Sequence, residues 1–128
     1  MMVIDTSAIL AVSFDEATAD WVIEQFENHR GQLLMSTVNL AESLMLFRRR
    51  LPAGADELEA RLLTSDLRFV PPTIDHARTA AAARHRFPLN IGDCFVYALS
   101  LAQNCPILTL DEDFRRCDRP LVIPPPGK

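Results

Sequence analysis

Long apolar runs are missing from this 128-residue sequence, and none approaches the ~20 residues that a membrane-spanning helix needs. The opening residues, Met1 to Asp5, include no basic segment and reach a charge too early for a secretory signal peptide. The three cysteines form no C-x-x-C pair and show no zinc-binding spacing. We therefore expect no membrane anchor, and free, buried thiols in a reducing cytoplasm.

Positive charge is not in excess either. Thirteen Lys and Arg against 17 Asp and Glu give a net charge of −4, which excludes binding to nucleic acid through bulk charge. Apolar residues make up 48% of the chain and charged residues 23%, which excludes a disordered chain. No repeat, low-complexity stretch or long linker divides the sequence, so we expect one domain over residues 1–128, with a proline-rich tail from about residue 124.

Short apolar runs alternate with amphipathic or capped segments along the chain. The runs predict strands over 1–4, 33–35, 68–70, 107–110 and 121–123. The segments between them predict a helical turn from Thr6 and helices over 17–29, 38–51, 55–65, 77–86 and 91–102. Their expected caps are a capping box over 13–16, Ser36 or Thr37, Thr73 and Asn90. Strands alternating with helices predict an α/β fold with a parallel sheet covered on both faces.

The predicted helix that carries Glu42 is apolar around nearly its whole circumference from Val38 to Phe47, which predicts burial on most sides. A carboxylate in that position is costly unless it is paired or bound to a cation. The alternative is that Asn39 and Ser43 form a small polar stripe with Glu42 and face water.

Two further acidic residues follow apolar strands. Asp5 and Asp111 each end a predicted strand, and ligands of open parallel sheets bind beyond such carboxyl ends. The alternative is that each aspartate caps the next helix or turn. Asp93 stands at the third helical position after Asn90, where it either completes a cap or contributes to a site. Gly92, just before it, permits close approach to the backbone.

If Asp5, Glu42, Asp93 and Asp111 converge, with Asp113 close behind, their mutual repulsion raises some of their pKa values. A hard divalent ion relieves that repulsion, and Mg²⁺ or Mn²⁺ prefers such oxygen ligands. An ion held there polarises a phosphoryl oxygen and activates water. The four residues predict phosphodiester hydrolysis on the condition that they converge.

Several motifs resemble those of a known family. Residues 2–8 (Met-Val-Ile-Asp-Thr-Ser-Ala) look like the opening of a PIN domain, and residues 89–99 closely resemble the central motif of VapC-type toxins. Residues 108–114 resemble the closing acidic motif of these toxins, with Asp118 following at a familiar distance. Glu42, within Asn-Leu-Ala-Glu, takes the place of the family's helix glutamate. The resemblance spans nearly the whole chain.

The resemblance implies a PIN-like three-layer α/β/α sandwich with a central, mostly parallel sheet, usually as a homodimer. It implies an Mg²⁺- or Mn²⁺-dependent endoribonuclease that cleaves RNA as a toxin and is silenced by a cognate antitoxin protein. Carried over by position, the acidic ligands are Asp5, Glu42, Asp93 and a fourth acid, for which Asp111 is the first choice and Asp113 the second. Supporting roles fall to Ser7 or Thr6, which would hold a metal water or orient Asp5, and to Thr109 in the Thr-x-Asp form.

An acidic ribonuclease needs local positive charge around its site. The candidates for this RNA-binding rim are Arg84, Arg86, Arg115 and Arg116, of which the last two come first because they follow the acidic motif. The Arg48 to Arg50 run is either a solvated helix end or a contact for phosphate or antitoxin. The helix 38–47 and the segment after it predict a surface for a second copy or an antitoxin.

Two other functions compete with this interpretation. The first is a catalytically silent PIN-like module that binds protein or RNA; the presence of every acid of the motif favours the enzyme. The second is a phosphatase that attacks with a strand-end aspartate. Such enzymes place a second aspartate two positions further on, where this chain has Ser7.

Overall fold

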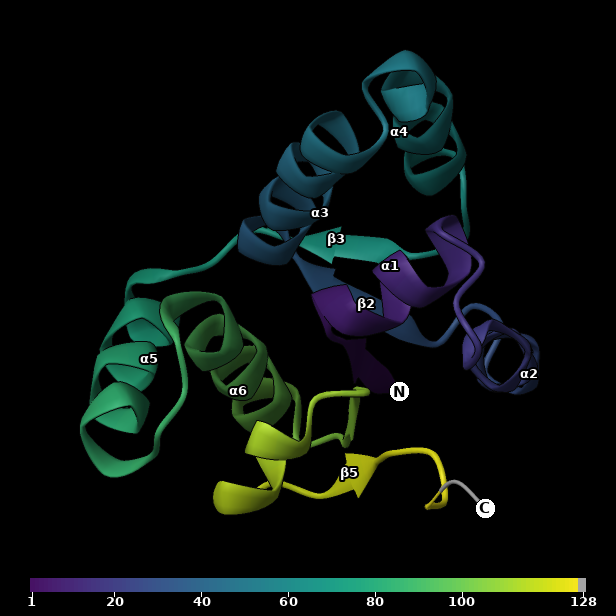
Figure 1. Ribbon diagram of the computed structural model, residues 1–128. Coiled ribbons are helices and arrows are strands. Elements are labelled where there is room, and N and C mark those ends of the chain that lie inside the picture. Colours follow the sequence, from purple (N-terminus) through teal and green to yellow (C-terminus); the bar gives the residue numbers. More distant parts are fainter. Residues whose placement is uncertain (127–128) are drawn as a thin grey trace.

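The computed structural model describes residues 1–126 and has a five-stranded parallel sheet at its centre (Figure 1). The strands are β1 Met2–Ile4, β2 Leu33–Ser36, β3 Arg68–Val70, β4 Ile107–Leu108 and β5 Leu121–Val122, in the order β3-β2-β1-β4-β5. Every neighbouring pair is parallel, as predicted. The predicted tail from about residue 124 falls in part on residues 127 and 128, which lie outside the described residues. The single domain over residues 1–128 stays a prediction.

Helices cover both faces of this sheet. They are α1 Thr6–Ser13, α2 Ala19–Asn28, α3 Thr37–Arg50, α4 Ala55–Leu63, α5 Ile74–Arg86 and α6 Ile91–Gln103, with the short 3₁₀ helices η1 Pro52–Gly54 and η2 Glu112–Arg116. Successive strand residues point to opposite faces. Val3 thus packs into a core with α5 and α6, whereas Met2 and Ile4 pack into a second core with α1 to α4. Figure 1 shows these helices on either side of the sheet, so the predicted three-layer sandwich is confirmed.

The strand order reverses between β1 and β4. From β1 the chain passes outward to β2 and β3, and it then returns to place β4 on the other side of β1. Val3 is paired with Ile107, and Ile4 with Leu108. Ligand sites of open parallel sheets lie at the carboxyl ends of strands at such a reversal. Asp5 immediately follows β1 at this point.

The caps of three helices agree with the sequence predictions. The Ser36 hydroxyl accepts a hydrogen bond from the Val38 N–H, and of the two predicted caps Ser36 is therefore the one used. Thr73 and Asn90 cap α5 and α6 in the same way. The Asn90 side chain accepts from the Asp93 N–H, and the Asn90 backbone in turn donates to the Asp93 carboxyl, so Asp93 takes part in the cap.

The predicted capping box over 13–16 is wrong. Helix α1 continues through Ser13, and the Phe14 N–H still donates to the Leu10 carbonyl. The chain then turns through Asp15 at a φ of 50°, so α2 begins later, at Ala19, without a side-chain cap. The polar residues that end α1 are of the same types as those that commonly begin a helix, and this is why the sequence predicted a helix start there.

Other boundaries differ by a few residues. The fourth strand ends at Leu108 rather than at residue 110, because Thr109 to Asp111 turn into η2. Helix α5 starts at Ile74, directly after its cap, and α4 ends at Leu63. In α2 Val22 is buried, whereas Trp21 and Phe26 are half-buried.

Both predictions for the Glu42 helix are wrong. Helix α3 is not buried on most sides, since Met45 on its outer face is 65% exposed. Asn39 and Ser43 do not face water either; both are fully buried, in line with Phe47. Their polar groups are accommodated by hydrogen bonds, because Asn39 donates to the Gly92 carbonyl and Ser43 donates to the Asn39 carbonyl.

The cysteines are free thiols, as predicted, but only two of them are buried. Cys94 and Cys105 lie in the core, whereas Cys117 is half-buried. Within residues 1–126, no helix has the length and apolar character required to cross a membrane.

Candidate active site

Asp5 lies at the carboxyl end of β1 and is 3% exposed. Although it precedes α1, its side chain makes no capping hydrogen bond. Its Oδ2 accepts instead from the Ser7 hydroxyl and from the Thr109 hydroxyl, each over 2.7 Å. Thr109 also accepts from the Asp111 N–H, so it joins the ends of β1 and β4. Asp5 is therefore held rigidly by two hydroxyl groups, and the capping alternative does not apply to it.

Glu42 reaches this edge of the sheet from α3. Its Oε1 accepts a 2.6 Å hydrogen bond from the Thr6 hydroxyl and a 3.2 Å hydrogen bond from the Asn39 amide. Thr6 directly follows Asp5, so α1 and α3 together position the carboxylate. This half-buried group is thus paired with neutral donors, not with a cation.

Asp93 comes from the first turn of α6 and is 7% exposed. Burial, then the negative charges of Asp5 and Asp111, raise its pKa to about 7, and the charge of Glu42 acts in the same direction. Its backbone N–H donates to the Asn90 cap over 2.9 Å. A hydrogen bond from the Asn90 backbone lowers the pKa of this carboxyl, and the raising effects outweigh it. Asp93 is therefore a buried acid whose neighbouring charges are all negative.

Asp111 acts electrostatically on the other acids, and Asp113 is not among the groups that shift their pKa values. Asp111 is half-buried, and its charge raises the pKa values of both Asp5 and Asp93. Asp111 also caps η2, as the alternative interpretation of this residue predicted. Its Oδ1 accepts a hydrogen bond from the Asp113 N–H over 2.9 Å. Asp113 is exposed, and its charge does not contribute to either shift. Of the two candidates for the fourth acid, Asp111 is therefore the one whose charge acts on Asp5 and Asp93.

These four acids, called here the carboxylate cluster, act on one another electrostatically. Burial raises the pKa of Asp5, hydrogen bonds from Ser7 and Thr109 lower it, and the charges of Asp111 and Glu42 raise it again. The structure therefore places Asp5, Glu42, Asp93 and Asp111 within range of one another's charge. Among the described residues, the charges that shift Asp5 and Asp93 all come from other carboxylates. The cluster is consequently a concentrated, uncompensated negative charge.

Each acid of the cluster keeps at least one oxygen without a protein donor. Asp5 is held through Oδ2, Glu42 through Oε1 and Asp111 through Oδ1, while the Asp93 carboxyl has a single hydrogen bond, from the Asn90 backbone. Within residues 1–126, the one buried side-chain polar atom without a partner is Asn39 Oδ1, so the second carboxylate oxygens reach solvent. Oxygen donors of this kind fit Mg²⁺ or Mn²⁺. In the arrangement shown, no group of three or more His, Cys, Asp or Glu side chains of the described chain is placed so that it could hold a metal ion.

The predicted basic rim divides into paired and unpaired side chains. Arg86 pairs with Asp118, and Arg115 pairs with Glu112. Arg84 and Arg116 are exposed and have no carboxylate at ion-pair distance within residues 1–126. Arg84 lines a pocket between α5 and α6 together with Ile91 and Cys94, and none of the four acids lines that pocket.

The Arg48 to Arg50 run makes contacts within the chain. Arg48 pairs with Asp56 and Glu59. Arg50 pairs with Glu16 and lies 4.0 Å above the Phe14 ring. These contacts favour the solvated helix end over a phosphate site.

Asn39 is the residue of this region that sequence reasoning missed. The sequence pattern groups Asn39 with Ser43 in a surface stripe, because polar residues on an otherwise apolar helix usually face water. The available signal was its spacing, since Asn39 stands one helical turn before Glu42, where side chains meet. Its contact with Gly92 depends on the packing of α3 against α6 and is not visible in the sequence.

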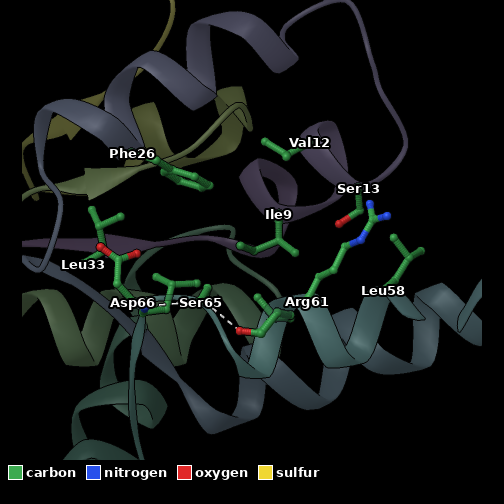
Figure 2. Close-up of a pocket in the computed structure, with 11 residues that line it drawn as sticks. Ile9, Val12, Ser13, Phe26, Leu33, Leu58, Arg61, Ser65 and Asp66 are labelled. Atoms are coloured by element: carbon green, nitrogen blue, oxygen red, sulfur yellow. Dashed lines mark hydrogen bonds between the residues drawn. The ribbon is translucent and has the colours of Figure 1, made fainter. Parts of the chain in front are cut away.

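An apolar cavity lies apart from the carboxylate cluster. It has a volume of about 240 Å³ and lies between α1, α2 and α4. Figure 2 shows Ile9, Phe26, Leu33 and Leu58 around it, with Arg61 and Asp66 at its margin. None of the four acids lines this cavity.

The sequence matches a known domain family over most of its length. The family model of the PIN domain matches residues 2–120. Ribonuclease VapC30 of Mycobacterium tuberculosis is 34% identical over 131 aligned residues, which cover 97% of this chain and all of the relative.

Solved structures of low sequence identity share the fold. VapC20 of Mycobacterium tuberculosis, described as a Sarcin-Ricin loop cleaving toxin, superposes with a TM-score of 0.78 at 19% identity, covering 90% of this chain and 93% of that one. DNA-bound VapBC from Salmonella typhimurium gives a TM-score of 0.78 at 13% identity, covering 95% of this chain and 96% of that one.

Proposed function

This chain belongs to the PIN-domain family, and within it to the VapC ribonucleases, and from that premise we propose that it hydrolyses RNA at the carboxylate cluster. Its activity is that of an endoribonuclease toxin. The RNA that it cuts, the metal that it uses and the residues that carry the reaction are part of the proposal.

One observation carries this assignment. Four carboxylates from four segments of the chain meet where the strand order reverses, and each keeps an oxygen without a protein donor. A purely structural cluster would be expected to include an arginine or lysine, because buried like charges destabilise the fold. The charges that act on Asp5 and Asp93 are instead all negative. A divalent cation from solvent would offset this charge, and the carboxylates would have to draw closer around it, because no three of the described acidic side chains are placed to hold an ion as they stand.

The ligands proposed for a divalent cation are Asp5, Glu42, Asp93 and Asp111, with Asp113 as the second choice for the last position. A bound Mg²⁺ or Mn²⁺ would supply a Lewis acid for the phosphate and lower the pKa of a nearby water. The chain itself orients the acids: Ser7 and Thr109 fix Asp5, and Thr6 fixes Glu42.

The protonation of Asp93 links activity to pH. Its pKa of about 7 means that a large fraction of the metal-free chain carries a proton on this carboxyl at neutral pH. A cation has to displace that proton before Asp93 can act as a ligand. We therefore expect metal binding to release protons and to strengthen as the pH rises.

The test is a cleavage assay with purified, antitoxin-free protein. Total RNA is incubated with Mg²⁺ or Mn²⁺, with and without chelator, beside the Asp93→Asn variant. We expect discrete fragments that disappear in the chelated and variant samples. No cleavage by folded protein would contradict the enzyme and favour the silent binding module, and cleavage by the variant would indicate a contaminating nuclease.

A matched pair of variants identifies the fourth acid. Asp111→Asn removes a half-buried charge that acts on Asp5 and Asp93, whereas Asp113→Asn removes an exposed charge two residues away. We expect the first to abolish cleavage and the second to retain most of it. The reverse result would assign the fourth position to Asp113.

An antitoxin partner follows from the VapBC complexes among the structural neighbours. We place its docking site in the apolar cavity between α1, α2 and α4. This cavity offers several large apolar side chains, including Ile9, Phe26 and Leu58. The surface that the sequence suggested, α3 with the segment after it, offers two exposed large apolar side chains, Met45 and Leu51. An apolar helix face fits a groove of this kind.

Two variants distinguish these surfaces. Leu58→Glu places a charge at the cavity, and Met45→Glu places the same charge on α3. Each is co-expressed with the product of the adjacent open reading frame and tested by affinity co-purification. We expect Leu58→Glu to lose the partner and Met45→Glu to keep it. Loss of the partner with Met45→Glu alone would instead place the antitoxin on α3.

The homodimer and the cytoplasmic location remain parts of the proposal. Light scattering on the purified chain tests the first, and a mass of one chain would contradict it. Cell fractionation tests the second, and recovery of the protein outside the cytoplasmic fraction would contradict it.

A further inference from the structure

Asn39 is a polar side chain in the interior of the protein. It lies on α3 with 0% exposure, one helical turn before Glu42. Both polar hydrogens of its amide have acceptors: Nδ2 lies 3.2 Å from Glu42 Oε1 and 3.1 Å from the Gly92 carbonyl. A single amide group therefore connects the Glu42 carboxylate to the first turn of α6, which carries Asp93.

This amide is used for its donors and not for its acceptor. Asn39 Oδ1 is buried and has no hydrogen-bond partner within residues 1–126. A buried acceptor without a hydrogen-bond partner destabilises the folded state. Asn39 therefore does not improve the packing of α3, and its contribution lies in the two groups that it holds together.

Gly92 provides the second half of this arrangement. A Cβ atom built on it would lie 2.5 Å from Glu42 Oε2 and 2.9 Å from Glu42 Cδ. The carboxylate thus rests directly on the backbone of α6, one residue before Asp93. The glycine is needed here for close approach and not for a left-handed backbone, because the residue is part of a regular helix.

Thr6 alone would not fix the Glu42 carboxylate. Its hydroxyl holds Oε1 from one side over 2.6 Å, and one hydrogen bond leaves the carboxylate free to rotate about it. Asn39 adds a second donor to the same oxygen, and the Gly92 backbone limits where Oε2 can lie. These contacts come from α1, α3 and α6.

We propose that Asn39 and Gly92 are positioning residues, which together hold the Glu42 carboxylate against the first turn of α6 and thereby set its place relative to Asp93. The inference rests on the proposed function, since it assumes that Glu42 is a ligand of the divalent cation. Neither residue touches the RNA or the cation; both act through Glu42.

The first arm of the test measures Mn²⁺ binding by calorimetry, apart from any cleavage. Asn39→Leu keeps a similar volume and loses both donors, and Gly92→Ala forces the carboxylate away while it leaves Asn39 in place. We expect each to weaken Mn²⁺ binding about 10–100-fold, which is typical when a group that orients a metal ligand is lost. Ser43→Ala, a buried hydroxyl on the same helix that does not touch Glu42, is the control and should change binding less than about threefold.

The second arm is a suppression experiment that a structural role alone would not satisfy. Glu42→Asp shortens the side chain and withdraws the carboxylate from the space that the new methyl group needs. We expect Glu42→Asp to weaken Mn²⁺ binding in the wild-type background and to restore part of it in the Gly92→Ala background. Additive losses in the double variant would overturn the proposal.

Folding and the proposed function are checked separately. Circular dichroism verifies each variant, and if Asn39→Leu does not fold, Asn39→Ser and Gly92→Ala carry the same test. If Glu42→Gln loses Mn²⁺ binding while the Asn39 and Gly92 variants retain it, the positioning inference is wrong and the proposed site stands. If Glu42→Gln itself binds Mn²⁺ and cleaves RNA normally, the assignment of Glu42 fails, and the inference fails with it.

Discussion

The Thr109 hydroxyl donates a 2.7 Å hydrogen bond to Asp5 Oδ2, across a sequence separation of 104 residues. The same hydroxyl accepts from the Asp111 N–H over 2.9 Å. Thr109 is fully buried and lies just beyond β4, beside the end of β1. One side chain therefore sets the spacing between two acids of the carboxylate cluster.

Replacement of Thr109 by valine tests this link. Thr109→Val keeps the shape of the side chain but removes the donor to Asp5 and the acceptor for the Asp111 N–H. We expect cleavage to fall about 10–100-fold, because the carboxylate loses a group that orients it. Thr109→Ser keeps the hydroxyl and is the control. Equal cleavage rates for Thr109→Val and the wild type would show that Ser7 alone suffices to hold Asp5.

The raised pKa of Asp93 predicts how stability depends on pH in the absence of divalent cations. The folded chain binds this proton with a pKa of about 7, against a model value of 3.8. Between these values the folded state holds more protons than the unfolded state, so the free energy of unfolding falls as the pH rises from about 4 to 7. Asp5, whose pKa is also raised, contributes in the same direction.

The variant Asp93→Asn should lose most of this dependence. We expect it to be more stable than the wild type at pH 8 by roughly 1–3 kcal/mol, and similar to it near pH 4. Urea unfolding with chelator present, at several pH values, measures the difference. Asp113→Asn, which alters an exposed side chain, is the control and should follow the wild-type profile. A wild-type stability that rises towards pH 8 would contradict the expectation.

Arg84 and Arg116 are the arginines of the predicted rim that have no ion-pair partner in the described part of the chain. We expect Arg84→Ala and Arg116→Ala to raise KM for RNA with little change in kcat, because phosphate contacts bind substrate and transition state alike. The logarithm of the RNA-binding constant falls linearly with the logarithm of the salt concentration, and each lost phosphate contact should make that slope shallower by about 0.7.

Arg115→Ala is the matched control for Arg116→Ala, since Arg115 already pairs with Glu112. It should have the smaller effect on KM. A larger effect for Arg115 would show that RNA displaces its partner.

Tyr97 and Asp118 give a prediction on stability alone. The buried Tyr97 hydroxyl donates to Asp118 Oδ1 over 2.7 Å, while Arg86 pairs with the same carboxylate at the surface. Tyr97→Phe keeps the ring and should cost about 0.5–1.5 kcal/mol in urea unfolding. Arg86→Gln removes an exposed ion pair and should cost less. A larger loss for Arg86→Gln would contradict this ranking.

Much of the fold was predictable because it depends on local patterns. The strand over Arg68 to Val70 and the caps at Thr73 and Asn90 depend on apolar runs and on short side chains that bond the next turn. The false capping box at Ser13 shows the limit of such patterns, because the end of α1 has the same residue types as the start of a helix.

The order of residues along the chain accounts for the groups that are available: buried strands that end at acids, a glutamate among apolar residues, and the motifs that resemble a family. How these groups meet depends on the folded arrangement of the sheet and helices. The sheet brings Thr109 to Asp5, and the packing of α3 against α6 turns Asn39 inward and rests Glu42 on Gly92. The physical reason is that hydrogen bonds between distant segments depend on strand order and helix packing, which no local pattern encodes.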